Sequence, residues 1–553
     1  MNGVFNKAEP VVLGFGGSGH EWAASAYKDG KLVAISEERL SRKKYGLGTD
    51  LLKGESRNAC LKELNSRQEE VTHAVACDLV PKSYYFPFRE RVEIINHHLA
   101  HAWSAFAMSG LTETAILVVD NAGSILEGEK YGDQRTVETI SLFKGDQNGI
   151  HLLKKQTGIN MQTVSSESDF LRDAGRTTNS LGDFYRSITL ALGFGFCSRE
   201  GGVFAEDGKT MGLSSYGDDR YIDDLNDVIE LKEEGVINYS PKRLDNLLKR
   251  KYYFDSFNSK AAFARAAQHH FERALLHLTN YLHKQTGLKS LCIAGGCALN
   301  SVANGRVLVE SDFSHVYVPP APSDDGISIG CTAYGVWKAT RCVPRFPQTA
   351  SLGPSYSDEV VFQAIEHSGL KAFVPDDLPA VVGKYLSNGD IVGWFQGRSE
   401  FGPRALGHRS ILALPQPGYV RDILNHDIKS REWFRPFAPM VTNEGQDTRF
   451  NFPGESPYMS FVSEVLKSSD LPAATHVDNT ARLQTVKKEM NPSIHQLLLE
   501  VEELTGAPVL LNTSFNAAGL PIVETPMDAI IAALEMKLDI LVLNNFVLEL
   551  KAG

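Results

Sequence analysis

Cysteine is scarce in this chain and shows no paired spacing. The 553 residues include seven cysteines, and no two of them are spaced Cys-x-x-Cys. Secreted proteins use cysteines in pairs as disulfides, and zinc modules and redox sites use closely spaced pairs. The pattern therefore argues against a disulfide framework and favours the reducing cytoplasm.

Long apolar runs and an excess of basic residues are also missing. No run approaches the length of about 20 residues that a transmembrane helix needs. The amino-terminal stretch MNGVFNKAEPVVLGF lacks the charged-then-apolar order of a secretory signal. The net charge of −11 argues against a nucleic acid as the main partner, because nucleic-acid binders present a basic face. We expect a cytoplasmic protein with small-molecule substrates and no nucleic-acid or membrane partner, and with a homodimer as one option.

The length and composition indicate a globular protein of at least two domains. A chain of 553 residues is too long for one ordinary core, and 42% hydrophobic with 22% charged residues is typical of a folded protein. Residues 339–357, ATRCVPRFPQTASLGPSYS, combine prolines with small polar residues and lack periodicity, which indicates a linker. We predict one α/β domain over residues 1–345 and a second over residues 346–553.

A glycine-rich stretch follows the first apolar run. Gly14, Gly16 and Gly19 match the G-x-G-x-x-G dinucleotide fingerprint superficially. That fingerprint needs a helix next, but residues 23–27 and 31–35 are two strand-like runs around Lys28-Asp29-Gly30, which is a hairpin pattern. A strand, a glycine-rich turn and a hairpin resemble the first phosphate-binding hairpin of the actin, sugar-kinase and Hsp70 architecture.

Two histidines and two aspartates form a candidate metal site. Residues 96–106, NHHLAHAWSAF, place His97 and His101 four apart on a predicted helix, where both can reach one ion. Asp120 and Asp324 follow buried strands, and such strand ends gather ligands at one sheet edge. This donor set suits Fe, Mn or Zn. Alternatively, the histidines pack on a helix and the aspartates form caps or turns, and the spacing leaves both interpretations open.

The segment EDGKTMGLSSYG suggests a phosphate-binding P-loop but does not satisfy its pattern. The required first glycine falls on Val203, and no strand is predicted before the segment. Lys209 remains a candidate phosphate contact, with a solvated side chain as the alternative.

The second half contains a dense group of cations, which are candidates for binding phosphate or carboxylate. Arg–Glu networks through Glu400 and Glu432 are the structural alternative. Two polar residues, Ser514 and Asn516, follow a predicted strand, where they form either a phosphoryl contact or an ordinary turn. The cations are Arg398, Arg404, His408, Arg409, Lys429, Arg431 and Arg435.

Together these motifs resemble the O-carbamoyltransferases of antibiotic and nodulation-factor biosynthesis, over nearly the whole chain. The resemblance implies an N-terminal actin/Hsp70-like domain, related to the tRNA threonylcarbamoyl transferases, and a C-terminal YrdC-like α/β domain. The matching strings are HHLAHA, VVDNAGS, KTMGLSSYG, GGCALNSVAN, PSDDGISIG, GRSEFGPRALGHRSIL and LLNTSFNAAGLPIVETP.

The resemblance also implies a two-step reaction. The C-terminal domain would make carbamoyl-adenylate from carbamoyl phosphate and ATP with Mg. The N-terminal domain would transfer the carbamoyl group to a hydroxyl of a small acceptor, such as a natural product or sugar, beside Fe(II), with Mn or Zn as alternatives. Carried over to this sequence, the metal ligands are His97, His101, Asp120 and Asp324. The KxR…SxN signature falls on Lys429, Arg431, Ser514 and Asn516.

The remaining residues that the resemblance implies are one base and several binding residues. His20 is the candidate base for the acceptor hydroxyl, and this sequence departs from the family pattern in the two residues that follow it, Glu21 and Trp22, which changes the expected shape of the acceptor pocket. The further binding candidates are Lys209, Gly295, Gly296, Asn300, Arg398 and Arg404.

Three other functions share some of these features. A tRNA threonylcarbamoyl transferase has the same metal motif but is disfavoured by the acidic net charge. A hydrogenase-maturation carbamoyltransferase needs an acylphosphatase segment and cysteine-rich zinc modules, for which we find no pattern. An Hsp70-like nucleotide-binding module without catalysis would bind ATP but release no pyrophosphate when carbamoyl phosphate is added.

Overall fold

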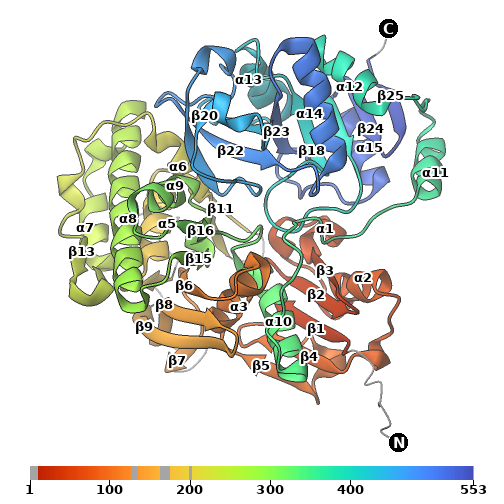
Figure 1. The fold of residues 1–553 in the computed structure, drawn as a ribbon. Helices are drawn as coiled ribbons and strands as arrows, with labels where there is room; N and C mark the ends of the chain where they lie inside the picture. Colours follow the sequence, from red (N-terminus) through yellow and green to blue (C-terminus); the bar gives the residue numbers. More distant parts are fainter. Residues whose placement is uncertain (1–9, 128–133, 162–174, 199–201, 552–553) are drawn as a thin grey trace, which may run out of the picture.

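The chain forms two N-terminal sheets below one large C-terminal sheet (Figure 1). The computed structural model describes residues 10–127, 134–161, 175–198 and 202–551. Residues 1–9, to which much of the expectation about a secretory signal applies, lie outside the described residues. None of the helices in the described ranges combines the length and apolar character needed to cross a bilayer.

The first sheet has the strand order β3-β2-β1-β4-β5. β1, β2 and β3 are antiparallel neighbours, whereas β4 and β5 run parallel to β1. The hairpin turn lies between Lys28 and Lys31, as the sequence predicts. The bounds are β1 Val12–Gly16, β2 Ala23–Lys28, β3 Lys31–Ser36, β4 His73–Cys77 and β5 Val92–Ile95, and α1 Glu37–Ser41 and α2 Glu55–Glu63 belong to the same part.

The second sheet repeats this topology. Its path β9-β8-β6-β15-β16 has antiparallel pairs up to β6 and parallel pairs beyond it, so two sheets of one design follow each other in the chain. This duplication is the actin/Hsp70-like arrangement that the sequence predicts. The bounds are β6 Thr114–Val119, β7 Ile125–Glu127, β8 Gln134–Asp146, β9 Gly149–Met161, β10 Arg176–Thr177, β15 Ser290–Ala294 and β16 His315–Tyr317.

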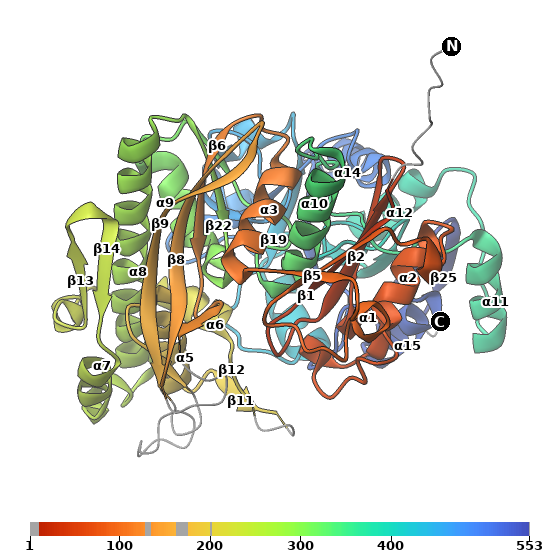
Figure 2. The ribbon, with the colours of Figure 1, turned by 90° about the horizontal axis from the view of Figure 1, so that it is seen from below.

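Helices α3 (His97–Ser109) and α10 (Ile327–Thr340) lie between the two sheets (Figure 2). They approach very closely, because a Cβ on Gly330 would lie 1.8 Å from the carbonyl oxygen of Ala100. This contact brings the start of α3 next to the turn that precedes α10.

The other face of the second sheet is covered by α8 and its neighbours. The predicted long amphipathic helix is α8. One local expectation was wrong: a short strand, β12, ends directly before α6, where none was predicted, because three residues are enough to pair with β11. The bounds are α5 Leu181–Ala191, β11 Gly195–Cys197, β12 Val203–Ala205, α6 Asp207–Ser214, β13 Ile229–Lys232, β14 Val236–Tyr239, α7 Pro241–Leu248, α8 Phe257–Thr286 and α9 Ser301–Glu310.

The C-terminal region is built on a nine-stranded sheet of order β20-β21-β22-β19-β23-β18-β17-β24-β25. Residues 341–357, within the predicted linker, contain no helix or strand. The α/β class with two parts is therefore confirmed. The strands are β17 Val392–Phe395, β18 Arg409–Ala413, β19 Ala438–Thr442, β20 Phe450–Asn451, β21 Phe461–Val465, β22 Thr480–Val486, β23 Val509–Ser514, β24 Ile540–Leu543 and β25 Phe546–Glu549. The helices are α11 Asp358–Ser368, α12 Leu378–Ser387, α13 Val420–Asp422, α14 Pro492–Thr505 and α15 Pro526–Glu535.

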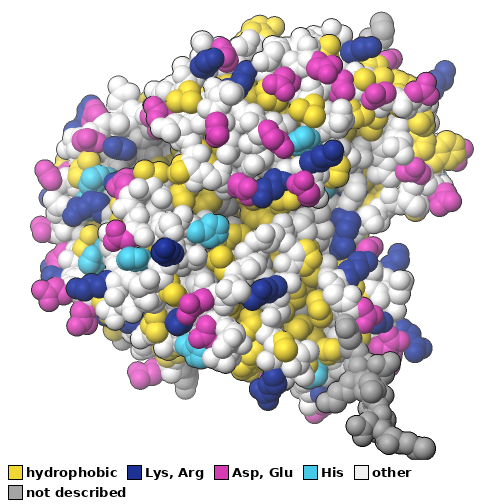
Figure 3. Space-filling model, viewed as in Figure 1, with side chains coloured by type: hydrophobic (Ala, Val, Ile, Leu, Met, Phe, Trp, Pro, Cys, Tyr) yellow, Lys and Arg dark blue, Asp and Glu magenta, His cyan; other side chains and the backbone are white. Residues whose placement is uncertain are grey.

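Arginines of α1 and its end join the first sheet to the C-terminal region. Arg39 donates hydrogen bonds to the carbonyl oxygens of Glu400 and Gly402 at 3.2 and 3.3 Å. Arg42 donates to the carbonyl oxygens of Ile522 and Pro521 at 2.6 and 3.0 Å. On the face shown in Figure 3, cationic and acidic side chains are interspersed, so the clustered cations described below are not a large basic patch of that face.

Candidate active site

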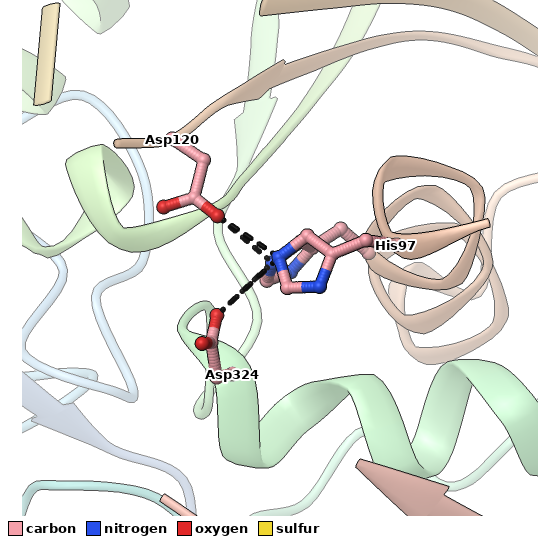
Figure 4. A group of neighbouring side chains, drawn as sticks. His97, Asp120 and Asp324 are labelled. Carbon is pink, nitrogen blue, oxygen red and sulfur yellow. Dashed lines mark hydrogen bonds and ion pairs between the residues drawn. The ribbon is translucent and has the colours of Figure 1, made fainter. Parts of the chain in front are cut away.

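The four predicted metal ligands converge in the interior of the N-terminal part. One ligand atom from each of His97, His101, Asp120 and Asp324 lies within 4.8 Å of the other three, and all four residues are buried. Figure 4 shows the Asp120 and Asp324 carboxylates pointing at the His97 ring on the side that faces away from α3. The His97 Nε2 atom lies 3.0 Å from Asp120 Oδ2 and 3.6 Å from Asp324 Oδ1. His101 Nε2 lies 3.7 and 3.5 Å from the same two oxygens.

Local structure places each ligand. The side chain of Asn96 caps α3 by accepting a hydrogen bond from the Leu99 amide at 3.1 Å, so the helix begins at His97. Asp120 follows β6, and its Oδ1 accepts hydrogen bonds from the Asn121 amide at 2.8 Å and, more weakly, from the Gly296 amide at 3.4 Å. The strands, the turn and the helix therefore hold the donors in place by backbone contacts.

Charge at the four ligands is balanced by protons. Burial alone would lower the pKa of His101, but hydrogen bonds with Asp120 and Asp324 raise it to about 9. Burial would raise the pKa of Asp120, but hydrogen bonds from His101 and His97 hold it well below its usual range. Two carboxylates thus carry negative charge that two histidines offset only when protonated, and a divalent cation would provide the same positive charge.

The donors fit a metal ion. His101 Nε2 is buried and lies 3.7 and 3.5 Å from one oxygen of Asp120 and of Asp324, so no short hydrogen bond occupies the nitrogen that a metal ion would use once its proton is displaced. His97 is oriented from behind, because its Nδ1 lies 3.3 Å from Cys77 Sγ, and such outer contacts fix the tautomer of a ligating imidazole. Two imidazoles and two carboxylates suit Fe(II), Mn or Zn.

The glycine-rich turn after β1 lies over this site. Ser18 Oγ donates a hydrogen bond to Asp324 Oδ2. His20 follows, with a side chain 37% exposed and its Nδ1 3.9 Å from Glu21 Oε2. Its ring packs edge-on against Phe204, with 5.5 Å between ring centroids. Trp22 is buried in the core of the first sheet beside Tyr84, so of the two departures from the family pattern only Glu21 stands next to His20.

A second cluster lies in the C-terminal region around Lys429. A π-helical turn, Ile423–Ile428, leads directly into this lysine. The Lys429 ammonium donates hydrogen bonds to the carbonyl oxygens of Ser514 and Asn516, both at 2.8 Å, and to Asn516 Oδ1 at 2.9 Å. Arg431 donates through Nε to Asn425 Oδ1 at 2.6 Å and stacks over Phe437. The predicted Lys, Arg, Ser and Asn of this half are therefore brought together.

Further arginines surround these residues with little negative charge between them. Among the described residues, no carboxylate forms an ion pair with Arg404, Arg431 or Arg482. Burial and Arg435 lower the pKa of Arg431 to about 9 and that of Arg404 to about 10. Burial and the same group of arginines hold the pKa of Arg482 well below its usual range. Below, the name cationic pocket stands for this cluster of side chains, which is Arg404, Lys429, Arg431, Arg435 and Arg482.

Comparison with known proteins identifies the family. Residues 82–333 match the family model described as "Carbamoyltransferase N-terminus", and residues 383–550 match the model described as "Carbamoyltransferase C-terminus". Nodulation protein NolO of Bradyrhizobium diazoefficiens is 34% identical, over 82% of this chain and 79% of that protein. The chain belongs to the O-carbamoyltransferase family. This carbamoyltransferase is also 32% identical to the 3'-hydroxymethylcephem-O-carbamoyltransferase of Amycolatopsis lactamdurans, over 59% of this chain and 61% of the relative.

One more sequence relative and one solved structure are also similar to this chain. An uncharacterised protein of Synechocystis is 32% identical, over 97% of this chain and 96% of its own length. A crystal structure of HypF from T. kodakarensis superposes with a TM-score of 0.42 and 15% identity, over 60% of this chain and 49% of that structure.

Other predicted binding residues of this carbamoyltransferase are occupied by contacts within the chain. Arg398 donates to the carbonyl oxygens of Gly353 and Leu352 at 2.8 and 2.6 Å, outside the Lys429 contacts. Asn300 caps α9 and exchanges hydrogen bonds with Gln268 at 3.0 and 3.1 Å. Lys209 forms an ion pair with Glu432, with 2.6 Å between Nζ and Oε1.

The small size of Gly295 and Gly296 makes room for the Asp120 carboxylate and its neighbouring strand in this carbamoyltransferase. A Cβ on Gly295, whose φ is +91°, would lie 2.2 Å from the carbonyl oxygen of Val119. A Cβ on Gly296 would lie 3.2 Å from Asp120 Oδ1. Both positions therefore need glycine if the Asp120 carboxylate is to stay where it is.

One residue of the cationic pocket was not predicted. Arg482 lies in β22 between two buried residues, Ala481 and Leu483, and in the sequence ARLQTV it has the polar place of an alternating strand. Alternation predicts exposure for such a residue, and nothing local distinguishes it. Only the packing of β22 near Arg404 and Arg431 shows its place.

Proposed function

We propose that this carbamoyltransferase activates the carbamoyl group as carbamoyl-adenylate in the cationic pocket and transfers it to a hydroxyl of a small molecule at the His97/His101/Asp120/Asp324 site. The observation that carries the proposal is the pairing of a partly buried, carboxylate-poor cationic pocket with a group of four metal-binding side chains in one chain. The first suits polyanionic substrates, and the second suits a Lewis acid.

Activation requires two anionic phosphate compounds to approach each other. Water must first break the carbamoyl–phosphate bond, which releases phosphate and leaves carbamate. The carbamate oxygen then attacks the α-phosphorus of ATP, and pyrophosphate leaves with Mg. Arginine forks bind phosphate oxygens in pairs, and they offset the charge that collects at the reacting phosphorus.

Lys429 has a distinct part in this step. Its nitrogen is held by neutral oxygens of Ser514 and Asn516 rather than by a carboxylate, so a bound anion would be the group that stabilises its charged form. Burial and the neighbouring arginines lower its pKa well below the usual value. A bound phosphate would raise the pKa of Lys429 again, because a nearby negative charge stabilises the ammonium form. The same attraction stabilises the bound phosphate.

Transfer then takes place at the N-terminal site. A metal ion held by the four donors would polarise the carbamoyl oxygen and stabilise its negative charge. His20, beside Glu21 and the glycine-rich turn, accepts the proton of the acceptor hydroxyl as its oxygen attacks the carbamoyl carbon. AMP leaves as the mixed anhydride breaks. The acceptor is a small hydroxylated compound, since carbamoylation of a hydroxyl is named for the Amycolatopsis relative.

The test separates the two steps. Wild-type protein incubated with ATP and carbamoyl phosphate should release pyrophosphate, and Lys429→Ala or Arg431→Ala should abolish that release. His101→Ala should keep pyrophosphate release and stop transfer. Transfer is detected by mass spectrometry as the gain of one carbamoyl group in a panel of hydroxylated natural products. Loss of both steps in His101→Ala, with the fold intact, would contradict this division of labour.

A further inference from the structure

One short segment of the chain touches both candidate sites. It starts at Phe204, whose ring packs against His20, and continues through α6. At its end, Tyr216 packs its ring against Trp433, with 5.4 Å between centroids, and Ser215 Oγ lies 3.4 Å from His476 Nδ1. Lys209 lies in the middle of this segment, on α6.

The ion pair of Lys209 crosses from the N-terminal part to the cationic pocket. Its Nζ lies 2.6 Å from Glu432 Oε1 and 2.7 Å from Glu206 Oε2, and the lysine side chain is only 16% exposed. Glu432 is the residue directly after Arg431. Its Oε2 lies 3.7 Å from Nη1 of Arg435, which is too long for a hydrogen bond.

Glu432 is therefore a carboxylate between two cations. Burial raises the pKa of Glu432, but Lys209 and Arg435 lower it by more. The pKa therefore lies below its usual value, and the carboxylate is ionised. An ionised carboxylate this close to Arg435 competes with any phosphate for the same guanidinium. The short contact with Lys209 keeps that competition weak, because Glu432 is directed at α6.

We propose that Lys209 is a positioning residue for the activation step: it holds the Glu432 carboxylate away from Arg435 and so leaves that guanidinium to a phosphate group. This inference rests on the proposed function, since it assumes a phosphate-bearing ligand in the cationic pocket. It differs from direct phosphate binding by Lys209, which the sequence suggests. If Lys209 binds the phosphate directly, replacing it removes one cation from the ligand. If Lys209 positions Glu432, replacing it instead frees the Glu432 carboxylate to compete with the ligand.

A double substitution distinguishes the two cases. Lys209→Met should raise the KM for ATP in pyrophosphate release, and the Kd of inorganic pyrophosphate measured by calorimetry, by about fivefold, the upper range of one partly exposed charge contact. Glu432→Gln alone should leave both constants unchanged or lower them. Lys209→Met combined with Glu432→Gln should return both to within about twofold of wild type, a difference of about 0.4 kcal/mol.

Matched controls exclude general damage. Lys209→Arg keeps the charge and should keep both constants. Lys144→Met removes an ion pair of similar length, 2.6 Å to Glu113, that lies on the second sheet, and it should change neither constant. Thermal unfolding midpoints show whether each variant is folded.

The possible results separate this inference from the proposed function. If the double variant binds pyrophosphate as weakly as Lys209→Met, Lys209 contacts the ligand itself and the positioning role is wrong. If wild type binds pyrophosphate, the pattern of rescue is seen, and no pyrophosphate is released from ATP, then the positioning role stands and the activation chemistry is wrong. If wild-type protein binds no pyrophosphate, the inference is overturned, because the pocket then holds no such anion.

Discussion

Substitution of Arg482 by methionine should stabilise the ligand-free protein and weaken its binding of pyrophosphate. Arg482 is surrounded by Arg404, Arg431 and Arg435, its Nε has no hydrogen-bond partner, and no described carboxylate pairs with it. An ordinary structural arginine would behave in the opposite way, because its loss removes hydrogen bonds. The sign of the stability change is therefore informative.

The magnitude follows from the cost of a buried, unpaired charge. That cost is several kcal/mol even after relaxation of the surroundings. Methionine keeps much of the apolar stem, so we expect to recover about 1–2 kcal/mol, or a rise of about 2–8 °C in the unfolding midpoint of a region of about 200 residues. A charge-assisted hydrogen bond contributes about 1.5–3 kcal/mol, so pyrophosphate should bind about 10- to 100-fold more weakly.

The assay is differential scanning calorimetry without ligand, together with titration of pyrophosphate. Arg449→Met is the matched control, since the Arg449 guanidinium donates to the carbonyl oxygen of Gly506 at 2.9 Å. It should lower the unfolding midpoint and leave pyrophosphate binding unchanged. A lower midpoint for Arg482→Met, with unchanged affinity, would refute the cationic pocket as an anion site and make Arg482 a structural residue.

Three further outcomes follow from the metal site. Gly295→Ala should lower the metal content measured by plasma emission spectrometry, because its Cβ would lie 2.2 Å from the Val119 carbonyl oxygen; a fully loaded variant would contradict this. Metal binding at pH 7 should release protons, since the pKa of His101 is raised to about 9 and the folded apo-protein holds that proton below this value; calorimetry in two buffers of different ionisation enthalpy counts them, and no buffer dependence would contradict it. Asn96→Ala should cost about 1 kcal/mol in unfolding free energy by removing the cap of α3, whereas Asn96→Ser should cost less.

The grouping of His97, His101, Asp120 and Asp324 could be predicted because most of its signals are local. Two histidines four apart on an apolar helix lie on one face whatever surrounds them, and Asp120 follows a strand that is buried throughout. The rule that such strand ends gather ligands at one edge places Asp120, whereas Asp324 lies seven residues beyond the end of β16, in the turn that leads into α10. The hairpin after the first glycines was predicted for the same reason, since Asp29 and Gly30 determine the turn.

The uses of single arginines could not be predicted. Arg398 and Arg404 stand six residues apart in one motif, but the first donates to the carbonyl oxygens of residues 352 and 353, and the second has no ion pair among the described residues. That difference is decided by the path of the linker past β17. Arg482 was missed for the converse reason, because its strand position alone predicts exposure.

The negative net charge of the chain and the positive charge of the cationic pocket are compatible, because they act on ligands of different size. Charges of both signs are interspersed on the face in Figure 3, and exposed charges are screened within about 10 Å at ordinary ionic strength. The arginines of the pocket are partly buried, so their charges are screened less than those of fully exposed side chains. A small polyanion that reaches the cationic pocket can pair with several guanidiniums at once. A large polyanion is repelled by the net charge of −11 of the whole chain before it can reach them. We therefore expect this placement of the cations to favour small phosphate compounds over nucleic acids.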